Sequence, residues 1–421
     1  MMPRSLRITG CVLILLLTGC ASLAPLLASP TPVPAPQASV TPEPIPTPTL
    51  PGTTSQPRLL RLWLPPQFDP NAGTPAAELL KTRLLDFQME YPAIQVEVRI
   101  KSETDILKTL SVTINAAPDA MPDLIALSYA NMQAAASAGF LHPFEGLTSV
   151  LQDPDWYAFA RELGHYQNTE YGIPFACDVL LASYRPAAFT EKPGAWEAIF
   201  DSDARMVFPV SDPNALFPLS LYLSANGQLV DEQGIVTLEE DALIRLLAFY
   251  EQAIETGAAL PFTKEYQTDL QALQFYLGGG AEIAVIRATS DIHSPSGEYH
   301  PLLGLNNTPY ALGDGWLLAL AGSSTENQPL AVELASYLVD SNYMSQWTRA
   351  SGYLPVRPQA LNGWEDEAVR TPLDEILQSA HPVPPVTVTA ALGPLLQGAL
   401  IRVFDGEQPE VVARSVLESL K

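Results

Sequence analysis

Over residues 59–100 the hydrophobic pattern changes from that of a strand to that of a helix and back to that of a strand. This alternation constrains the fold more than any other feature of the sequence. Residues 59–64 (LLRLWL) are a mostly apolar run typical of a strand. Thr74 and Pro75 then predict the start of a helix, as its N-cap and its first turn. Residues 94–100 (IQVEVRI) alternate strictly between apolar and polar side chains. Strand, helix and strand together predict a βαβ unit with a right-handed crossover.

The same alternation continues along the chain. Thr237 and Glu240 have capping-box spacing and predict the start of another helix. Pro329 predicts the first turn of a later one. We also expect a helix over 106–116, a small-residue helix that includes 134–139 and ends at Gly139, and strands over 122–127, 282–287 and 317–320. The chain therefore belongs to the α/β class, and we find no internal repeat.

The first twenty residues have the features of an export signal. Arg4 and Arg7 precede a short apolar run over residues 8–17, and LTGC follows at 17–20. A positive start, a short apolar core and small residues before a cleavage site are typical of a secretory signal peptide. The LTGC segment resembles a bacterial lipobox, which implies cleavage after residue 19 and a lipid on Cys20. An ordinary signal peptide or an uncleaved anchor helix is the alternative.

Residues 20–57 predict a tether. Proline, threonine, serine and alanine dominate residues 30–57, a composition that favours polyproline II over a packed core. At about 3.1 Å per residue such a segment can hold a domain far from a membrane. An unselected low-complexity tail is the alternative.

Length, cysteine usage and charge restrict the possible architecture and partners of the folded part, residues 58–421. This length favours two lobes over one core. Cys177 is its single cysteine, and we expect it to be a small buried residue. The net charge of −24 argues against nucleic acid and anionic membranes as partners. Membrane contact is therefore expected from the lipid on Cys20.

Several short motifs resemble, in the same order, the family 1 extracellular solute-binding proteins, the group that includes maltose-binding protein. The resemblance extends over almost the whole chain from about residue 60. It rests on 87–97 (FQMEYPAIQVE), 121–125 (MPDLI), 138–141 (AGFL), 171–175 (YGIPF), 193–197 (PGAWE), 275–284 (FYLGGGAEIA), 331–335 (AVELA) and 351–356 (SGYLPV). The chain departs from the family's pattern at 182–185 (ASYR), which leaves the ligand open.

The resemblance implies a two-lobed periplasmic-binding-protein fold of type II, with lobes joined by a multi-strand hinge. It implies lobe 1 over 58–174 and 287–345, and lobe 2 over 175–286 and 346–421. A small solute, expected to be a sugar, would be captured between the lobes by hinge closure. A monomer anchored outside the cytoplasm would then deliver it to the permease subunits of an ABC transporter.

Family sites lie on loops after strands and face the interlobe cleft. Aromatic rings match the C–H faces of a sugar, and charged or amide groups match its hydroxyls. For each aromatic residue the alternative is core packing, and for Asp178 and Arg287 it is a structural ion pair. The implied ligand-binding residues are Trp63, Ser128, Tyr129, Asp178, Arg287, Asp314, Trp316 and Tyr353.

Three other functions are alternatives for this sequence. The sequence lacks G-x-S-x-G, H-E-x-x-H, P-loop and G-x-G-x-x-G motifs, so we predict no enzyme and no cofactor. Metal capture would need ligands such as Asp291, His293, Glu298 and His300, but these surround a plain loop, so we predict no metal site. A binding protein that acts as a sensor or partner module, without transport, is the third alternative.

Overall fold

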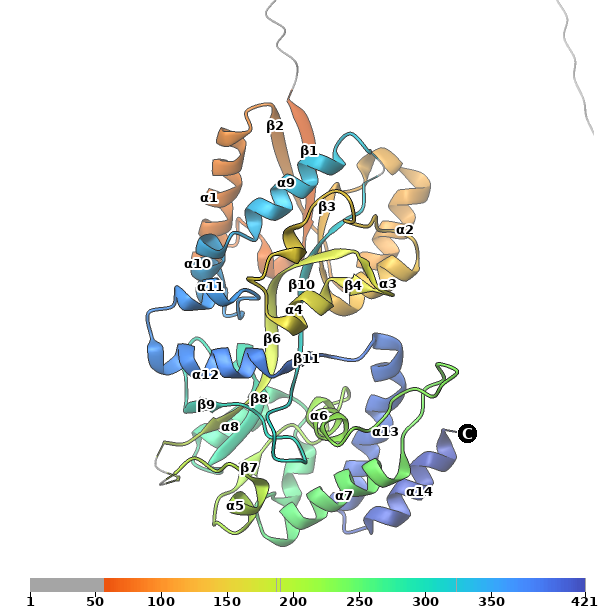
Figure 1. The fold of residues 1–421 in the computed structure, drawn as a ribbon, viewed down its shortest axis with the longest axis vertical. Coiled ribbons are helices and arrows are strands. Elements are labelled where there is room, and N and C mark those ends of the chain that lie inside the picture. Colours follow the sequence, from red (N-terminus) through yellow and green to blue (C-terminus); the bar gives the residue numbers. More distant parts are fainter. Residues whose placement is uncertain (1–56, 187, 190, 323, 421) are drawn as a thin grey trace, which may run out of the picture. The chain divides into compact units, whose positions relative to one another are not determined.

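The computed structural model describes residues 57–186, 188–189, 191–322 and 324–420. The predicted signal peptide over 1–19, the lipidation site at Cys20 and nearly all of the tether lie outside these residues. All the helices and strands described here belong to one compact unit, Ser55–Lys421 (Figure 1).

The predicted βαβ unit is confirmed at the start of this unit. β1 (Arg58–Leu64) and β2 (Ile94–Ile100) pair in parallel, and α1 (Pro75–Glu90) connects them. The Thr74 hydroxyl accepts a hydrogen bond of 3.2 Å from the backbone N–H of Ala77, as expected of an N-cap. β3 (Leu124–Ser128) pairs in parallel with the other edge of β1, after α2 (Ile106–Ala116).

One nine-stranded sheet runs through the unit. Seven of its strands follow the order β2-β1-β3-β10-β6-β8-β7, and the other two branch from it, β11 beside β10 and β9 beside β6. Its longest strands, β6 (Gly172–Tyr184) and β10 (Ala311–Leu320), are antiparallel neighbours. The first half of β6 pairs with β10, and the second half pairs with β8 (Ile283–Arg287) and β9 (Glu298–His300). β6 therefore passes from one half of the sheet into the other, as a hinge strand must.

Two lobes follow from this topology (Figure 1). We call lobe 1 the part built on β1, β2, β3 and the adjoining halves of β6 and β10, and lobe 2 the part built on β7 (Met206–Val207), β8, β9 and the rest of β6. Two hydrophobic cores support them, and the first also takes in Val207, Ile286 and Tyr299 from the lobe 2 strands. The first includes Leu62, Leu127 and Leu317, and the second includes Phe208, Leu247 and Leu400.

The other helices cover the sheet or join its parts, and short strands complete it. They are α3 (Tyr129–Ser137), α4 (Ala158–Leu163), β4 (His165–Tyr166), β5 (Thr169–Glu170), α5 (Trp196–Phe200), α6 (Leu216–Ser224), α7 (Glu240–Glu255), α8 (Asp269–Leu277), α9 (Gln328–Leu338), α10 (Ser341–Ser351), α11 (Pro358–Asn362), α12 (Glu367–Gln378), β11 (Ala380–Pro382), α13 (Val386–Phe404) and α14 (Pro409–Ser419). Single 3₁₀ turns lie at Pro66–Phe68, Pro118–Ala120, Val150–Gln152, Pro261–Glu265 and Ala288–Ser290.

Two local predictions were wrong. Thr237 does not cap a helix, because α7 begins at Glu240 and its N-cap position is Glu239, so the threonine hydroxyl stands too early in the chain. A capping box forms instead at α8, between Thr268 and Gln271. The strand predicted over 317–320 begins at Ala311, because pairing with β6 and β11 extends it.

The two cores do not follow the predicted lobe segments everywhere. Leu302 and Leu303 fall in the segment predicted for lobe 1, yet they pack in the second core. Trp347 and Ala380 fall in the segment predicted for lobe 2, yet they pack in the first core. As a statement of which residues move together, the division into 58–174, 175–286, 287–345 and 346–421 stays a prediction.

α13 is apolar and long enough to cross a membrane by length and composition. It packs instead inside lobe 2, where Leu392, Leu396 and Leu400 are fully buried in the second core. Burial against α7 and α14 accounts for its composition.

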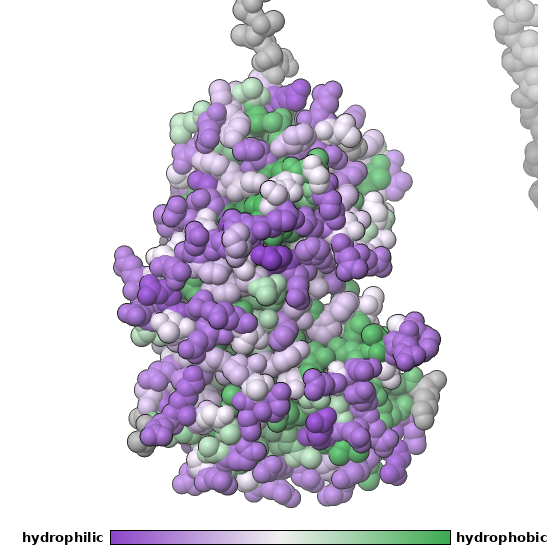
Figure 2. Space-filling view, in the orientation of Figure 1, coloured by the Kyte–Doolittle hydropathy of each residue, from purple (hydrophilic) through white to green (hydrophobic). Residues whose placement is uncertain are grey.

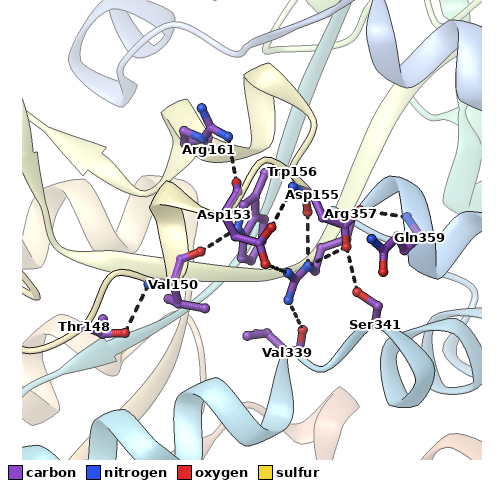
Figure 3. Close-up of polar contacts among 10 residues, drawn as sticks. All are labelled: Thr148, Val150, Asp153, Asp155, Trp156, Arg161, Val339, Ser341, Arg357 and Gln359. Carbon is purple, nitrogen blue, oxygen red and sulfur yellow. Dashed lines mark hydrogen bonds and ion pairs between the residues drawn. The ribbon is translucent and has the colours of Figure 1, made fainter.

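A buried ion-pair cluster fastens the loop before α4 to the C-terminal half of the chain (Figure 3). The Arg357 guanidinium, 8% exposed, donates to Asp155 Oδ2 at 3.1 Å and to Asp153 Oδ2 at 2.5 Å. It also donates to the Val339 carbonyl at 2.9 Å, and Asp155 accepts from the Ser341 hydroxyl at 2.8 Å. Segments about 200 positions apart in the chain are thereby joined through fully paired charges.

Candidate functional site

A cavity of about 250 Å³ lies between the two lobes. Lobe 1 provides a largely polar wall. Lobe 2 provides an aliphatic wall of Leu216, Val383, Pro384 and Val386, with the polar residues Asn214, Arg287 and Thr389 beside it. Figure 2 shows hydrophobic residues gathered near the start of α13, on the aliphatic side. The lining residues are Glu103, Ser128, Tyr129, Ala130, Gln133, Asn214, Leu216, Arg287, Asp314, Val383, Pro384, Val386 and Thr389.

The ends of two strands place three of the predicted residues in this wall. β3 ends at Ser128, and α3 begins immediately at Tyr129, so both residues reach the cavity. Arg287 is the last residue of β8 and lines it from the lobe 2 side. This is the carboxyl-end position at which ligands bind in open α/β sheets.

Asp314 also lines the cavity, but from within β10, although the strand was predicted to begin only at residue 317. Gly313 and Gly315 flank it because β6 approaches closely there. A Cβ at Gly315 would stand 2.5 Å from the Ala176 carbonyl oxygen, and one at Gly313 would stand 2.7 Å from a Val179 methyl carbon. The two glycines therefore allow the tight strand pairing that holds Asp314 in place.

Asp178 lies opposite Asp314 in the β6–β10 register, next to the cavity but outside its lining. Its carboxylate accepts from the backbone N–H of Thr289 at 3.1 Å and from the Thr289 hydroxyl. Burial and the neighbouring charge of Asp314 raise the pKa of Asp178 to about 7, although the Thr289 hydrogen bonds and Arg287 oppose them. Burial raises the pKa of Asp314 too, and Glu103 adds to this while Arg287 opposes it.

Arg287 is the cation among these acids. Its Nε lies 3.3 Å from Asp269 Oδ2, at the first residue of α8. Burial works against its charge, but Asp178, Asp314 and Asp269 together raise its pKa. Part of the hydrogen-bonding capacity of Arg287 is therefore used within the protein. This agrees with the alternative that Arg287 forms a structural ion pair.

The two predicted tryptophans lie deeper. Trp63 and Trp316 line a small cavity of about 10 Å³ that shares Glu103 and Ser128 with the main one. Trp63 is 2% exposed and has Lys101 Nζ 4.6 Å from its ring centroid. Trp316 packs edge-on against Phe68 at 5.0 Å. Both rings therefore pack in the first core, as in the alternative of core packing, and they lie at the edge of the site.

Tyr353 lies in the aromatic group around Phe68, with ring centroids 5.6 Å apart, and does not line the main cavity. Tyr129 does line it, and burial, with Glu162, raises its pKa to about 12. Its hydroxyl therefore stays protonated at neutral pH and can donate a hydrogen bond.

Sequence reasoning missed the aliphatic wall and four polar residues, Glu103, Gln133, Asn214 and Thr389. Gln133 stands four residues after Tyr129 on α3, so the two share a helix face. That spacing could have identified Gln133 once Tyr129 was placed. Val383, Pro384 and Val386 come from the far C-terminal part of the chain and carried no family motif.

The alternative metal ligands do not form a cluster. Among the described residues, no group of three or more His, Cys, Asp and Glu side chains is placed to hold a metal ion. Asp291 accepts from the hydroxyls of Ser296 and Tyr299 at 2.9 and 3.2 Å. His300 packs on Tyr184 at 4.5 Å, and burial lowers its pKa to about 4. These side chains are used in local packing.

Known structures share this fold. The sugar-binding protein MalE from Xanthomonas citri matches with a TM-score of 0.71 and 18% identity, over 86% of this chain and 96% of its own. The cyclic α-maltosyl-1,6-maltose binding protein from Arthrobacter globiformis matches with a TM-score of 0.70 and 13% identity, over 86% and 98%. A Thermotoga lettingae solute-binding protein bound to α-D-tagatose matches with a TM-score of 0.62 and 20% identity, over 86% and 98%. The predicted two-lobed binding-protein fold is confirmed.

No curated protein sequence matches the chain. The family model for bacterial extracellular solute-binding proteins (SBP_bac_8) matches residues 84–372. The motifs predicted family 1, whereas the matching model describes family 8. The broader prediction, a bacterial extracellular solute-binding protein, is therefore confirmed. The match also confirms a binding protein in place of an enzyme. The chain belongs to the bacterial extracellular solute-binding proteins.

Proposed function

We propose that the chain captures a carbohydrate in the interlobe cavity and delivers it to an ABC importer as a monomer tethered by a lipid on Cys20. The main support for this proposal is the composition of the two cavity walls. Its polar wall, with Ser128, Tyr129 and Asp314, suits sugar hydroxyls. Its aliphatic wall, with Leu216 and Val386, suits the C–H face of a ring.

The comparisons support a sugar because the similar structures include a sugar-binding protein, a cyclic α-maltosyl-1,6-maltose binding protein and a solute-binding protein bound to α-D-tagatose. The family supports delivery to a transporter, and the LTGC motif supports the lipid anchor. No metal or cofactor is part of the proposal.

The proposed mechanism is hinge closure on the strands that run between the lobes. The cavity draws residues from both lobes, with Tyr129 from lobe 1 and Arg287, Leu216 and Val386 from lobe 2. A ligand that touches both walls favours the closed arrangement over the open one. Closure removes the polar contacts from water, where a missing hydrogen bond discriminates most strongly between solutes. The permease would then bind the closed form.

The test is thermal melting of the protein with mono- and oligosaccharides, polyols and metal ions. A ligand that binds the native state at about a hundred times its Kd stabilises it by about 2.7 kcal/mol. We expect a sugar to raise the melting temperature and Asp314→Asn to diminish that rise. Asp241→Asn, an exposed aspartate at the start of α7, removes the same charge and should leave the rise unchanged.

Loss of the ligand response in both variants, or a response to metal ions alone, would contradict the proposal. A response to none of the compounds would favour the sensor or partner-module alternative.

A further inference from the structure

One turn of lobe 2 carries two of the residues that line the cavity. Residues 211–216 lie between β7 and the start of α6, and both Asn214 and Leu216 line the cavity. Asn214 is exposed, and its side-chain carboxamide forms no hydrogen bond with a described residue. A carboxamide offers donors and an acceptor together, so it can bind two neighbouring sugar hydroxyls. The conformation of the 211–216 turn therefore determines whether Asn214 meets the ligand.

Ala215, between these two lining residues, has an unusual backbone conformation. Its φ is 49° and its ψ is 43°, in the left-handed region that alanine rarely adopts. Glycines apart, the other described residues with a positive φ are three asparagines and Gln167. Asparagine tolerates this region because its side chain can hydrogen-bond locally, which alanine cannot do. Left-handed residues of this kind persist only where their surroundings hold them, and they cluster at ligand sites.

Hydrogen bonds hold the turn at both of its ends. The Asp212 carboxylate accepts from the backbone N–H of Asn214 at 3.0 Å and from that of Leu216 at 3.2 Å. The Gln397 side chain, from α13, donates to the Ser211 carbonyl at 2.6 Å. The turn is therefore fixed from within by one carboxylate and from outside by α13.

α13 approaches the turn so closely that a side chain does not fit between them. A Cβ at Gly393 would collide with the Pro213 carbonyl oxygen and stand 3.2 Å from the Asn214 Cα atom. Both are backbone atoms, so they cannot rotate away as the end of a side chain could. A side chain at position 393 would therefore displace the turn.

The proline that follows Gly393 does not account for this glycine. Gly393 precedes Pro394 inside α13, and the residue before a proline is sterically restricted in a helix. Yet α12 has Thr371 before Pro372 in its interior, so this protein accommodates a side chain at such a position. The close approach of the turn is the better explanation for Gly393.

The same face of α13 also reaches the cavity. Val386 and Thr389 line the cavity, and Gly393 and Gln397 follow Thr389 at intervals of four residues. Residues at spacings of three and four lie on one face of a helix. α6 and α13 are neighbours in lobe 2 (Figure 1). α13 thus contributes part of the cavity wall and supports the turn beside it.

We propose, building on the sugar-binding function above, that Gly393 and Ala215 are positioning residues, which hold the Asn214 carboxamide against a pair of ligand hydroxyls. Gly393 sets the distance of the turn from α13. The left-handed conformation of Ala215 sets the direction in which the chain leaves Asn214 and enters α6. A turn that is fixed before the ligand arrives loses less conformational entropy on binding.

A double-mutant cycle tests whether Gly393 acts through Asn214. The full-length chain in mild detergent is titrated calorimetrically with glucose, maltose and tagatose. For a sugar that binds the native protein, we expect Asn214→Ala and Gly393→Ala each to weaken binding about tenfold, as for the loss of one hydrogen bond. The double variant should bind no more weakly than Asn214→Ala alone, because Gly393 has no effect once the carboxamide is gone.

Gly398→Ala is the matched control. It makes the same change on the same helix, but the added Cβ meets nothing within 4 Å, so the affinity should stay native. A Gly393→Ala variant that binds as tightly as the native protein overturns the inference and leaves the sugar-binding function intact. So does a double variant that binds about a hundredfold more weakly, since the two effects are then independent. If none of the sugars binds the native protein, the sugar-binding function fails, and the inference that rests on it fails too.

Ala215→Gly decides the matter if Gly393→Ala does not fold. Glycine adopts the left-handed region readily but also adopts others, so Asn214 is in place for less of the time. We expect binding at least about threefold weaker at a nearly native melting temperature, which a loss of stability alone would not produce. Asn226→Gly, at an exposed left-handed residue after α6, should leave the affinity unchanged. Native affinity in Ala215→Gly would refute the positioning role.

Discussion

Asp178→Asn is expected to stabilise the protein at high pH. Asp178 is 7% exposed, and burial together with Asp314 raises its pKa from an ordinary value of 3.8 to about 7. A carboxyl with a raised pKa binds its proton more tightly in the folded state than in the unfolded state. Its stabilising effect is therefore complete below about pH 4 and is lost as the pH rises through about 7.

The magnitude follows from that pKa. The rise from 3.8 to about 7 corresponds to about 4 kcal/mol between the protonated and ionised forms. Asparagine resembles the protonated form in shape and charge, and it can keep its hydrogen bonds with the backbone N–H and hydroxyl of Thr289. For a folded unit as long as Ser55–Lys421, about 4 kcal/mol corresponds to a rise in melting temperature of about 5 °C.

Scanning calorimetry of the native protein and Asp178→Asn at pH 4, 6 and 8 measures the effect. The two proteins should melt at similar temperatures at pH 4, and the variant should melt higher at pH 8. Asp241→Asn, whose side chain is exposed, controls for the loss of one negative charge. A variant that melts at or below the native protein at pH 8, or a difference that does not change with pH, would refute the electrostatic reasoning.

Three further predictions concern other parts of the chain. Arg357→Met should lower the free energy of unfolding, measured in urea, by about 3–5 kcal/mol, because it leaves Asp155 buried without its cation. A decrease below about 1 kcal/mol would contradict this. Gly315→Ala should lower the melting temperature, since its Cβ meets the Ala176 carbonyl, and a neutral effect would show that the strands can separate at no cost. Cys20→Ser should move the protein from the membrane to the soluble fraction, and continued membrane attachment would exclude the lipid anchor.

The sequence predicted the fold well where the periodicity was local. The strict alternation of residues 94–100 and the N-cap at Thr74 both identified the first βαβ unit correctly. Thr237 failed because a capping motif does not determine the position at which a helix begins. β10 extends beyond its predicted residues because strand length depends on distant partners, here β6 and β11.

The candidate site was also predictable in part, because some of its residues follow strands that the local periodicity identifies. Ser128, Tyr129 and Arg287 follow strands that are visible in the sequence, so their place at the strand ends could be anticipated. Asp178 and Tyr353 adjoin the site without lining it, because Asp178 is buried against Thr289, to which it is hydrogen-bonded, and Tyr353 packs around Phe68. The aliphatic wall comes from the start of α6, the start of α13 and the segment before α13, which only tertiary folding brings together at the cavity.

The passage of β6 and β10 between the lobes has a consequence for the order in which the chain can fold. The first core extends from Leu60 to Ala380, and the second from Leu180 to Val416. During synthesis from the N-terminus, neither core can be completed until most of the chain has left the ribosome. A polypeptide that must cross a membrane as an extended thread benefits from this delay, because export can begin before any stable globule exists.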